Sequence, residues 1–544
     1  MMRPCLLAAA GLCLRVARGR EAPVMNEGGI PYAISNAAPG GEYSTNFNVN
    51  AMGPVEHFDV YGEIRTRYSE VYWTRNEPIN LPPDLVKRFD GKVMAITGYE
   101  IDQVTHAGPQ PGSTTTDTKL GGFACYPECP GTDKSVPIYH AYNHHYFSWL
   151  VGKNAEMVIR DKPSRIPNPT WTSFRDRPGV NSQFPSSIVF KENPGGEFRK
   201  SYHGYPGGFA QLVESPQQWV VNPMQIDTHN RNVDITDESG YQPWFLPTSQ
   251  QNRMTDFNSR LSPLIECPCT DRVTRKIVNE SGKEMHYWAY MNGTFKEWEG
   301  YSCEGEPRSD MAQGGVGTGP PGPNPACSMA TYHGGLQCCW PGWFLTDLAQ
   351  EALIPDKTDV YFLKWRYYFQ EYLPTPASHA HLHHWVFLID AQVNDYEEVC
   401  PSCGSRNIGV ITAHLQAKDM GLEDTPKSYK TITPLVMTPH CHAPSCIREQ
   451  LYNADTGDII CDVSPQYGHA MHGDVKKAFN EENYVSISPC LWGYQSGLHH
   501  PLVLRPDTNL TAVKHFNNTY RHLGQMAQWT GLMVYDHDAP YSFI

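Results

Sequence analysis

Apolar and polar residues alternate along many short segments of the chain, and clusters of glycine, proline and other turn formers separate these segments. Alternation with a period of two places every second side chain on the same face of an extended strand. The clearest predicted strands are residues 93–101, 138–151, 218–226, 359–369, 383–389, 408–415, 429–437, 484–491 and 528–536. Short strands at this spacing, without a competing helical period, predict an all-β protein made of antiparallel, jelly-roll-like β-sandwiches.

The alternation stops between about Cys267 and Cys339, where cysteine, glycine and proline dominate. Such a composition is typical of an exposed connector and not of a packed sheet. We therefore predict two β-sandwich domains joined by a Cys/Gly/Pro-rich connector. The N-terminal sandwich is placed at 50–265, the disulfide-rich connector at 266–345 and the C-terminal sandwich at 346–544.

Residues 1–22 have the composition of a secretory signal peptide, with Arg3 before an apolar run from Cys5 to Leu14 and small residues after it. The run is too short to cross a bilayer, and no later segment is long and apolar enough to do so. We therefore expect a secreted, extracellular protein without a transmembrane segment.

The 16 cysteines, less the two in this leader, leave 14, an even number that suits a disulfide-bonded secreted protein. Cys400 and Cys403 have the spacing of half a zinc site, but no second pair with zinc spacing lies near them, so disulfides are favoured. Sequons for N-glycosylation agree with a secreted glycoprotein; they occur at Asn279, Asn292, Asn509 and Asn517.

The chain carries 43 Lys and Arg residues against 57 Asp and Glu residues, a formal net charge of −14, without a run of like charges. This balance disfavours nucleic acid and anionic membrane surfaces as partners. The expected partner is a small-molecule or peptide substrate, and the sequence specifies neither its identity nor the oligomeric state.

The 23 histidines are numerous for this length and occur in groups. His440 and His442 are two residues apart, so on a strand both imidazoles face the same side and can share one metal ion. Imidazole suits copper, zinc, iron and nickel, whereas a thioether such as that of Met526 selects for copper. Because the motif is short, a lone His-x-His pair favours hydrogen-bonded sheet or surface histidines, so its context decides between the two interpretations.

A second alternating series, His379, His381 and His383, has the spacing of one strand face and therefore good metal geometry. No acidic or thiolate partner can be assigned to these residues. We interpret them as structural histidines.

The elements that follow His440 come in a distinctive order: the His-x-His pair, a strand and turn, a cysteine-containing strand, the segment HHPLVLRPDTNLT, and HLGQM before the last strand. This order resembles the C-terminal domain of the copper type II, ascorbate-dependent monooxygenases, the family of peptidylglycine α-hydroxylating monooxygenase and dopamine β-monooxygenase. The resemblance implies that His440, His442 and Met526 are the catalytic residues and hold the copper at which oxygen is activated.

Longer motifs resemble the stress up-regulated nodulin family, secreted proteins thought to be relatives of those enzymes. The motifs are YNHHY (142–146), QIDT (225–228), CPCTDR (267–272), GGLQCCW (334–340), residues 439–468, ENYVSISPC (482–490) and HLGQMAQWTGLMVY (522–535). The resemblance covers about residues 130–540, most of the mature chain.

The N-terminal domain of the monooxygenases holds a second copper on three histidines, two of them adjacent, and His144 and His145 match that pair. Adjacent residues of a regular strand point to opposite faces, so joint ligation needs a β-bulge or a strand end there. At the place of the third histidine this chain has Met224. The third ligand is therefore Met224, His229 or His203, or this site is empty.

The resemblance implies a copper-dependent monooxygenase that hydroxylates a C–H bond with O₂ and takes electrons from a reductant such as ascorbate. Thr438 replaces the arginine with which the peptide-hydroxylating enzyme holds a carboxylate, so glycine-extended peptides are poor candidate substrates. The alternative is a non-catalytic extracellular copper-binding or structural glycoprotein on the same scaffold, which Met224 and Thr438 both favour. Zinc hydrolysis ranks lower because Met526 is a poor zinc ligand.

Overall fold

The protein is described by a computed structural model. It covers residues 55–68, 70–73, 76–110, 121–136, 141–159, 172–180, 182–192, 204–205, 208–227, 358–373, 380–390, 408–419, 428–441, 446–467, 485–487, 489–494, 498–517 and 527–536, and the backbone of short strands between 272 and 347. Almost all of these residues lie in strands of antiparallel sheets, which confirms the all-β class. Every predicted strand segment overlaps a strand of the structure. Within the described residues, no helix has the length and apolar character needed to cross a membrane.

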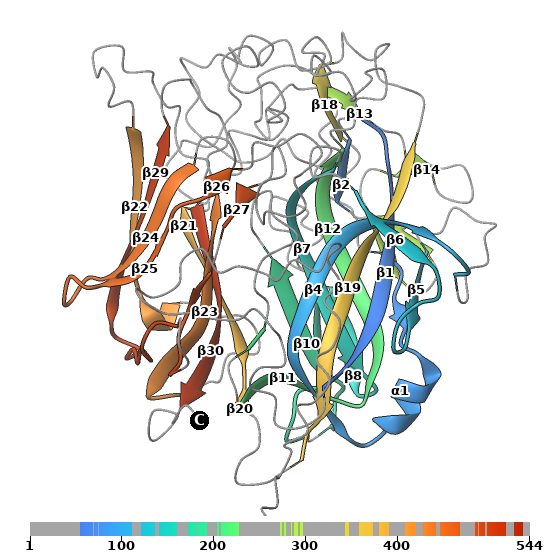
Figure 1. Cartoon of the computed structure of the whole chain (residues 1–544), viewed down its shortest axis with the longest axis horizontal. Helices are drawn as coiled ribbons and strands as arrows, with labels where there is room; N and C mark the ends of the chain where they lie inside the picture. Colours follow the sequence, from blue (N-terminus) through green and yellow to red (C-terminus); the bar gives the residue numbers. More distant parts are fainter. Residues whose placement is uncertain are drawn as a thin grey trace, which may run out of the picture.

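One sheet, the first sheet, has seven strands. Its hydrogen-bonded order is β20 (Ala380–His381), β11 (Phe209–Glu214), β4 (Val93–Ala107), β19 (Asp359–Glu371), β1 (Glu56–Thr66) and β5 (Gly122–Cys125), and β6 (Thr132–Ser135) also pairs with β4. The strands β4 and β1, drawn in blue in Figure 1, lie on either side of β19, drawn in yellow. All pairs are antiparallel except β11 with β20.

The central strand of this sheet comes from far along the chain. β19 belongs to the segment 346–544 that the sequence pattern assigns to the C-terminal domain, yet it is hydrogen-bonded between β1 and β4 (Figure 1). Its apolar side chains are buried on both faces, as in an interior strand. The first sheet is therefore not built from residues 50–265 alone, and the boundary at residue 346 does not separate the sheets.

A second sheet has five strands. They are β10 (Ser187–Glu192), β7 (Ala141–Gly152), β12 (Pro216–Asp227) and β2 (Val71–Trp73), with β3 (Ile79–Asn80) also paired with β12. One apolar cluster joins it to the first sheet. Inside that cluster Trp219 donates its indole N–H to Ser148 at 2.5 Å and to Tyr367 of β19 at 3.0 Å, so the two sheets face each other across a shared core.

The C-terminal part contains two four-stranded sheets, drawn in orange and red in Figure 1. One has the order β21 (His383–Asp390), β30 (Ala527–Asp536), β23 (Thr431–Cys441) and β28 (Cys490–Leu491). The other has the order β22 (Ile408–Gln416), β29 (Asn509–Asn517), β24 (Cys446–Asn453) and β25 (Ile459–Val463). A disulfide between Cys461 and Cys490 links β25 to β28, and therefore joins the two sheets.

The remaining elements are short. Strand pairs are β8 (Ala155–Ile159) with β9 (Thr172–Asp176), β13 (Arg272–Thr274) with β18 (Trp343–Asp347), β14 (Ile277–Val278) with β15 (Glu284–Met285), β16 (Trp288–Met291) with β17 (Thr294–Glu297), and β26 (Gln466–Tyr467) with β27 (Val485–Ser486). Helices are α1 (Pro83–Arg88), with Pro83 in its first turn, and a 3₁₀ turn at Ala417–Asp419. The predicted signal peptide and the cysteines of the predicted connector lie outside the described residues.

Candidate functional site

The adjacent histidines lie on β7 at a β-bulge. His145 is aligned with Met224 of β12, whereas the next pair along the strands joins Asn143 to Gln225. Two residues of β7 therefore oppose one position of β12, and His144 is the extra residue. This is the irregularity that the sequence argument requires if two consecutive histidines are to serve one metal ion. The side chain of His144 lies outside the described ones.

The bulge also determines which face His145 occupies. After the bulge along β7, Tyr146 and Leu150 point into the core between the first two sheets. Before the bulge, Ala141 points into the same core. His145 points away from this core, and its ring centroid lies 5.9 Å from that of Phe147. Directly opposite partners share a face, so the Met224 thioether lies on the same side as the His145 imidazole.

Met224 is buried and packs in an apolar cluster with residues of the C-terminal sheets, including Met437 of β23 and Trp529 of β30. The outward face of β12 at Met224 is therefore where the second sheet meets the C-terminal part. The apolar cluster around Met224 therefore extends from the second sheet into the C-terminal sheets.

The C-terminal candidate begins at His440, which is buried on β23 opposite Gln528 of β30. Thr438 occupies the same face two residues earlier, and its carbonyl accepts a hydrogen bond of 3.3 Å from the Thr530 hydroxyl. The last aligned pair of the two strands joins Cys441 to Ala527. His442 and Met526 are the sequence neighbours of that pair, and both lie outside the described residues, as do His203 and His229.

The alternating series His379, His381 and His383 does not lie along one strand. His381 belongs to β20 in the first sheet, and His383 opens β21 in a C-terminal sheet. The Nδ1 atom of His381 accepts a hydrogen bond of 2.9 Å from the backbone N–H of Leu212. A structural role therefore explains His381, while His379 lies outside the described residues.

Among the described residues, no group of three or more His, Cys, Asp or Glu side chains is arranged to hold a metal ion. The five cysteines whose side chains are described are all in disulfides: Cys125 with Cys129, Cys461 with Cys490, and Cys446. This agrees with the expected oxidation of the cysteines.

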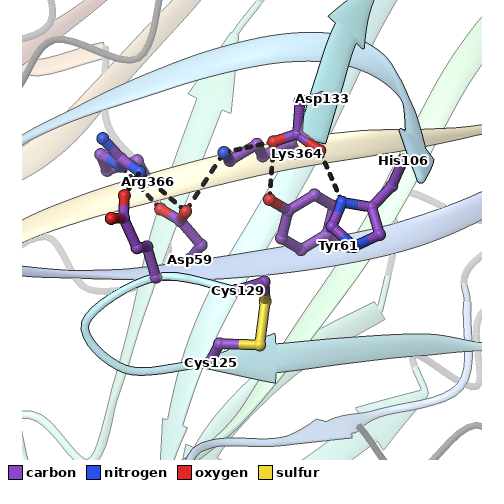
Figure 2. Close-up of a disulfide and its surroundings, with 9 residues drawn as sticks. Asp59, Tyr61, His106, Cys125, Cys129, Asp133, Lys364 and Arg366 are labelled. Carbon is purple, nitrogen blue, oxygen red and sulfur yellow. Dashed lines mark hydrogen bonds and ion pairs between the residues drawn. A yellow bond between two sulfur atoms is a disulfide. The ribbon is translucent and has the colours of Figure 1, made fainter. Parts of the chain in front are cut away.

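A network of buried charges on the outer face of the first sheet is not visible in the sequence pattern (Figure 2). Asp59 of β1 accepts two hydrogen bonds from Arg366 of β19, at 2.7 and 2.9 Å. Lys364 lies between two carboxylates, 3.1 Å from Asp59 and 2.6 Å from Asp133. Asp59, Lys364 and Arg366 are all buried.

The Asp133 carboxylate also accepts hydrogen bonds from the Tyr61 hydroxyl at 2.8 Å and from Nδ1 of His106 at 2.7 Å. Burial alone would raise the pKa of Asp133, but Lys364, His106 and Tyr61 together lower it below its usual value. Burial and the nearby carboxylates raise the pKa of Tyr61, so its hydroxyl stays protonated and donates.

The loop closed by the Cys125–Cys129 disulfide lies beside this network (Figure 2). It carries Glu128, whose carboxylate lies 3.2 Å from Arg366. Two charged residues at positions 364 and 366 of a strongly apolar strand share one face, and this spacing is the one sequence signal that could have indicated the network.

A scan of known protein families and a search of curated proteins found no match for this chain.

Proposed function

We propose that the chain is a secreted glycoprotein of two jelly-roll-like sandwiches that binds copper through His144, His145 and Met224 at one place and through His440, His442 and Met526 at another. The proposed activity is hydroxylation of a substrate C–H bond with O₂ and an ascorbate-type reductant. When bound, copper would supply one-electron redox chemistry and oxygen activation.

The observation that carries the proposal is the β-bulge at His144 opposite Met224 and Gln225. A bulge at a histidine pair supports joint ligation, because regular strand geometry would send the two imidazoles to opposite faces. The alignment of His145 with Met224 supports a mixed imidazole and thioether donor set. Such a set favours copper, and Cu(I) in particular.

The register of β23 and β30 supports the second site. Cys441 is aligned with Ala527 at the ends of the two strands. His442 follows Cys441 in the sequence and Met526 precedes Ala527, so both residues are attached to neighbouring strand ends. His440 is buried two residues before His442, so it would present its imidazole from a water-poor surface. There a ligand is held in place by its neighbours and not by solvent.

The proposal is tested by measuring copper per chain in the full-length secreted protein after dialysis against copper(II) and ascorbate. We expect His440→Ala and His145→Ala each to remove about half of the bound copper, because each removes an imidazole ligand from a different site. His414→Ala is the matched control, since His414 lies on β22 and contacts Thr511 at 2.9 Å. Copper content that neither ligand variant changes would contradict the proposal.

Non-catalytic copper binding is the second candidate, and the burial of Met224 within an apolar cluster favours it. The copper monooxygenases that the chain resembles have a third histidine at this position. Met224, which stands there in this chain, also packs against apolar neighbours. Ascorbate-driven oxygen uptake by the copper-loaded protein separates the two roles. Uptake no faster than that of the same copper bound by a simple histidine peptide, with full copper occupancy, would assign the non-catalytic role.

A further inference from the structure

The strand β22 forms one edge of a C-terminal sheet. It is aligned with β29 over nine consecutive residue pairs without a bulge, and on its other side it pairs with no described strand. β21 of the facing sheet comes near β22 but does not pair with it. In Figure 1, β22 lies on the side of the C-terminal part that is away from the first sheet. An edge strand of this kind presents a row of backbone N–H and C=O groups to a further strand.

The burial of the side chains on β22 also indicates an open edge. Ala413 and Leu415 pack against the apolar cluster that the two C-terminal sheets share, yet both remain partly exposed. Their partners on β29, Ala512 and Leu510, are completely buried. Burial is therefore lost at β22, and the described part of the chain leaves the outer side of this strand uncovered.

The sequence of β22 has none of the features that usually protect an edge. Proteins block exposed edges with charged side chains, proline or bulges, or keep them very short. β22 is nine residues long, contains no Asp, Glu, Lys, Arg or Pro, and exposes about half of Ile408 and Val410.

The other edge of the same sheet, β25, differs in both respects. It has five residues, and its Asp462 carboxylate accepts a hydrogen bond of 2.7 Å from Arg448 of β24. The edge at β25 is therefore short and charged, whereas the edge at β22 is long and uncharged. This difference favours β22 as the place where a strand is added.

We infer that β22 pairs antiparallel with β22 of a second copy of this chain, about a two-fold axis at Thr412. The two four-stranded sheets then become one continuous sheet of eight strands. The axis sets Thr412 opposite itself, a cross-strand pair that can hydrogen-bond, and Val410 opposite His414.

The strand suits a second copy because it is complementary to itself. Without a charged residue on β22, no two like charges meet across the axis. Two strands of this length form about eight inter-strand hydrogen bonds, which is close to the number in a typical protein interface, about ten. The pairing also covers the exposed apolar side chains of Ile408 and Val410 in part.

The test measures the mass of the full-length secreted protein by sedimentation velocity between about 1 and 100 µM, a range that covers interfaces of modest affinity. We expect a reversible equilibrium between monomer and dimer. Thr412→Lys sets two ammonium groups opposite each other at the axis and should weaken the dimer at least about 10-fold.

Val513→Lys is the matched control. Val513 is aligned with Thr412 and belongs to β29, so the variant adds the same charge to the same sheet face, one strand inside the edge. We expect this control to dimerise like the wild type. An equal mixture of Thr412→Lys and Thr412→Glu should restore the dimer, because opposite charges then meet at the axis. A variant that had merely lost its fold would not be rescued by the mixture.

Two outcomes overturn the inference. A wild type that stays monomeric at about 100 µM would leave the edge to a different protein. A dimer that Thr412→Lys does not weaken would have to use another surface. None of these measurements involves copper, so the inference and the proposed function fail separately.

Discussion

Buried charges occur in two contrasting settings in this molecule. On the outer face of the first sheet, Arg366 and Asp133 each contact oppositely charged groups at hydrogen-bonding distance. On β10 and β24, Lys191 lies on an aromatic ring and Glu449 lies fully buried, with neither carboxyl oxygen hydrogen-bonded to any described residue.

The pKa shifts of these residues follow the setting and not the depth of burial. Burial opposes the charge of Arg366, but its hydrogen bonds to Asp59 raise the pKa overall, whereas burial lowers the pKa of Lys191. Burial raises the pKa of Glu449, with only a partial offset from Lys514, its cross-strand partner. The difference teaches that the hydrogen bonds and ion pairs of the first setting favour the charged forms, whereas burial against apolar side chains disfavours the charged forms of Lys191 and Glu449.

The largest expected effect comes from breaking the network. Asp59→Asn keeps the shape of the side chain but leaves Arg366 and Lys364 buried with one carboxylate fewer. We expect the free energy of unfolding to fall by about 3–5 kcal/mol, measured by urea denaturation. Glu156→Gln, which breaks the more exposed pair with Arg175, should change it by less than about 0.5 kcal/mol. Equal losses in the two variants would mean that burial does not distinguish the pairs.

Opening the loop beside the network should have the second largest effect. Replacing Cys125 and Cys129 together by serine opens the loop that holds Glu128 near Arg366. The entropy of closing so short a loop corresponds to a loss of about 2 kcal/mol in the free energy of unfolding. Amide hydrogen exchange in β1 and β5 should accelerate in this variant, and unchanged exchange would show that the network holds without its loop.

Lys191→Met should change how stability depends on pH. Between about pH 7 and the usual lysine value, the unfolded chain binds a proton that the folded protein has released, so the stability of the wild type rises with pH. The variant should lose this rise, which is at most about 1.4 kcal/mol per pH unit. Denaturation at pH 7, 8 and 9 measures it, and parallel curves for wild type and variant would show that Lys191 stays charged when folded.

Glu449→Gln should have the smallest effect and the opposite sign. The raised pKa means that the folded protein holds a proton that the unfolded chain has released, so stability falls as pH rises above the usual glutamate value. The variant removes this fall and should gain on the order of 1 kcal/mol at pH 7. A variant that is less stable than wild type at pH 7 would indicate that the ionised carboxylate and Lys514 stabilise the core.

Local patterns are sufficient to predict the strands, because alternation is a property of neighbouring residues. β1 was missed because Glu56, Asp59, Glu63 and Arg65 interrupt its apolar positions. Local patterns do not show which strands are hydrogen-bonded to each other. Asp59 and Arg366 are 307 positions apart, and only the register of β1 against β19 makes them neighbours.

The candidate site shows the same limit. The need for a bulge at His144 follows from strand geometry, and the structure has the bulge. The alignment of Met224 with His145 could not be derived, because it depends on how β12 pairs with β7. The unusual setting of Lys191 was equally hidden, since a lone lysine in a strand is usually exposed.

The position of β19 has a consequence for synthesis. β1 and β4 are both made early, but the strand that hydrogen-bonds to each of them emerges from the ribosome more than 250 residues after β4 is complete. Until then, the facing edges of β1 and β4 remain open to wrong partners. Nascent chains that stop before Asp359 should therefore bind chaperones through these edges, and an N-terminal fragment expressed alone should aggregate unless a β19 peptide is supplied in trans.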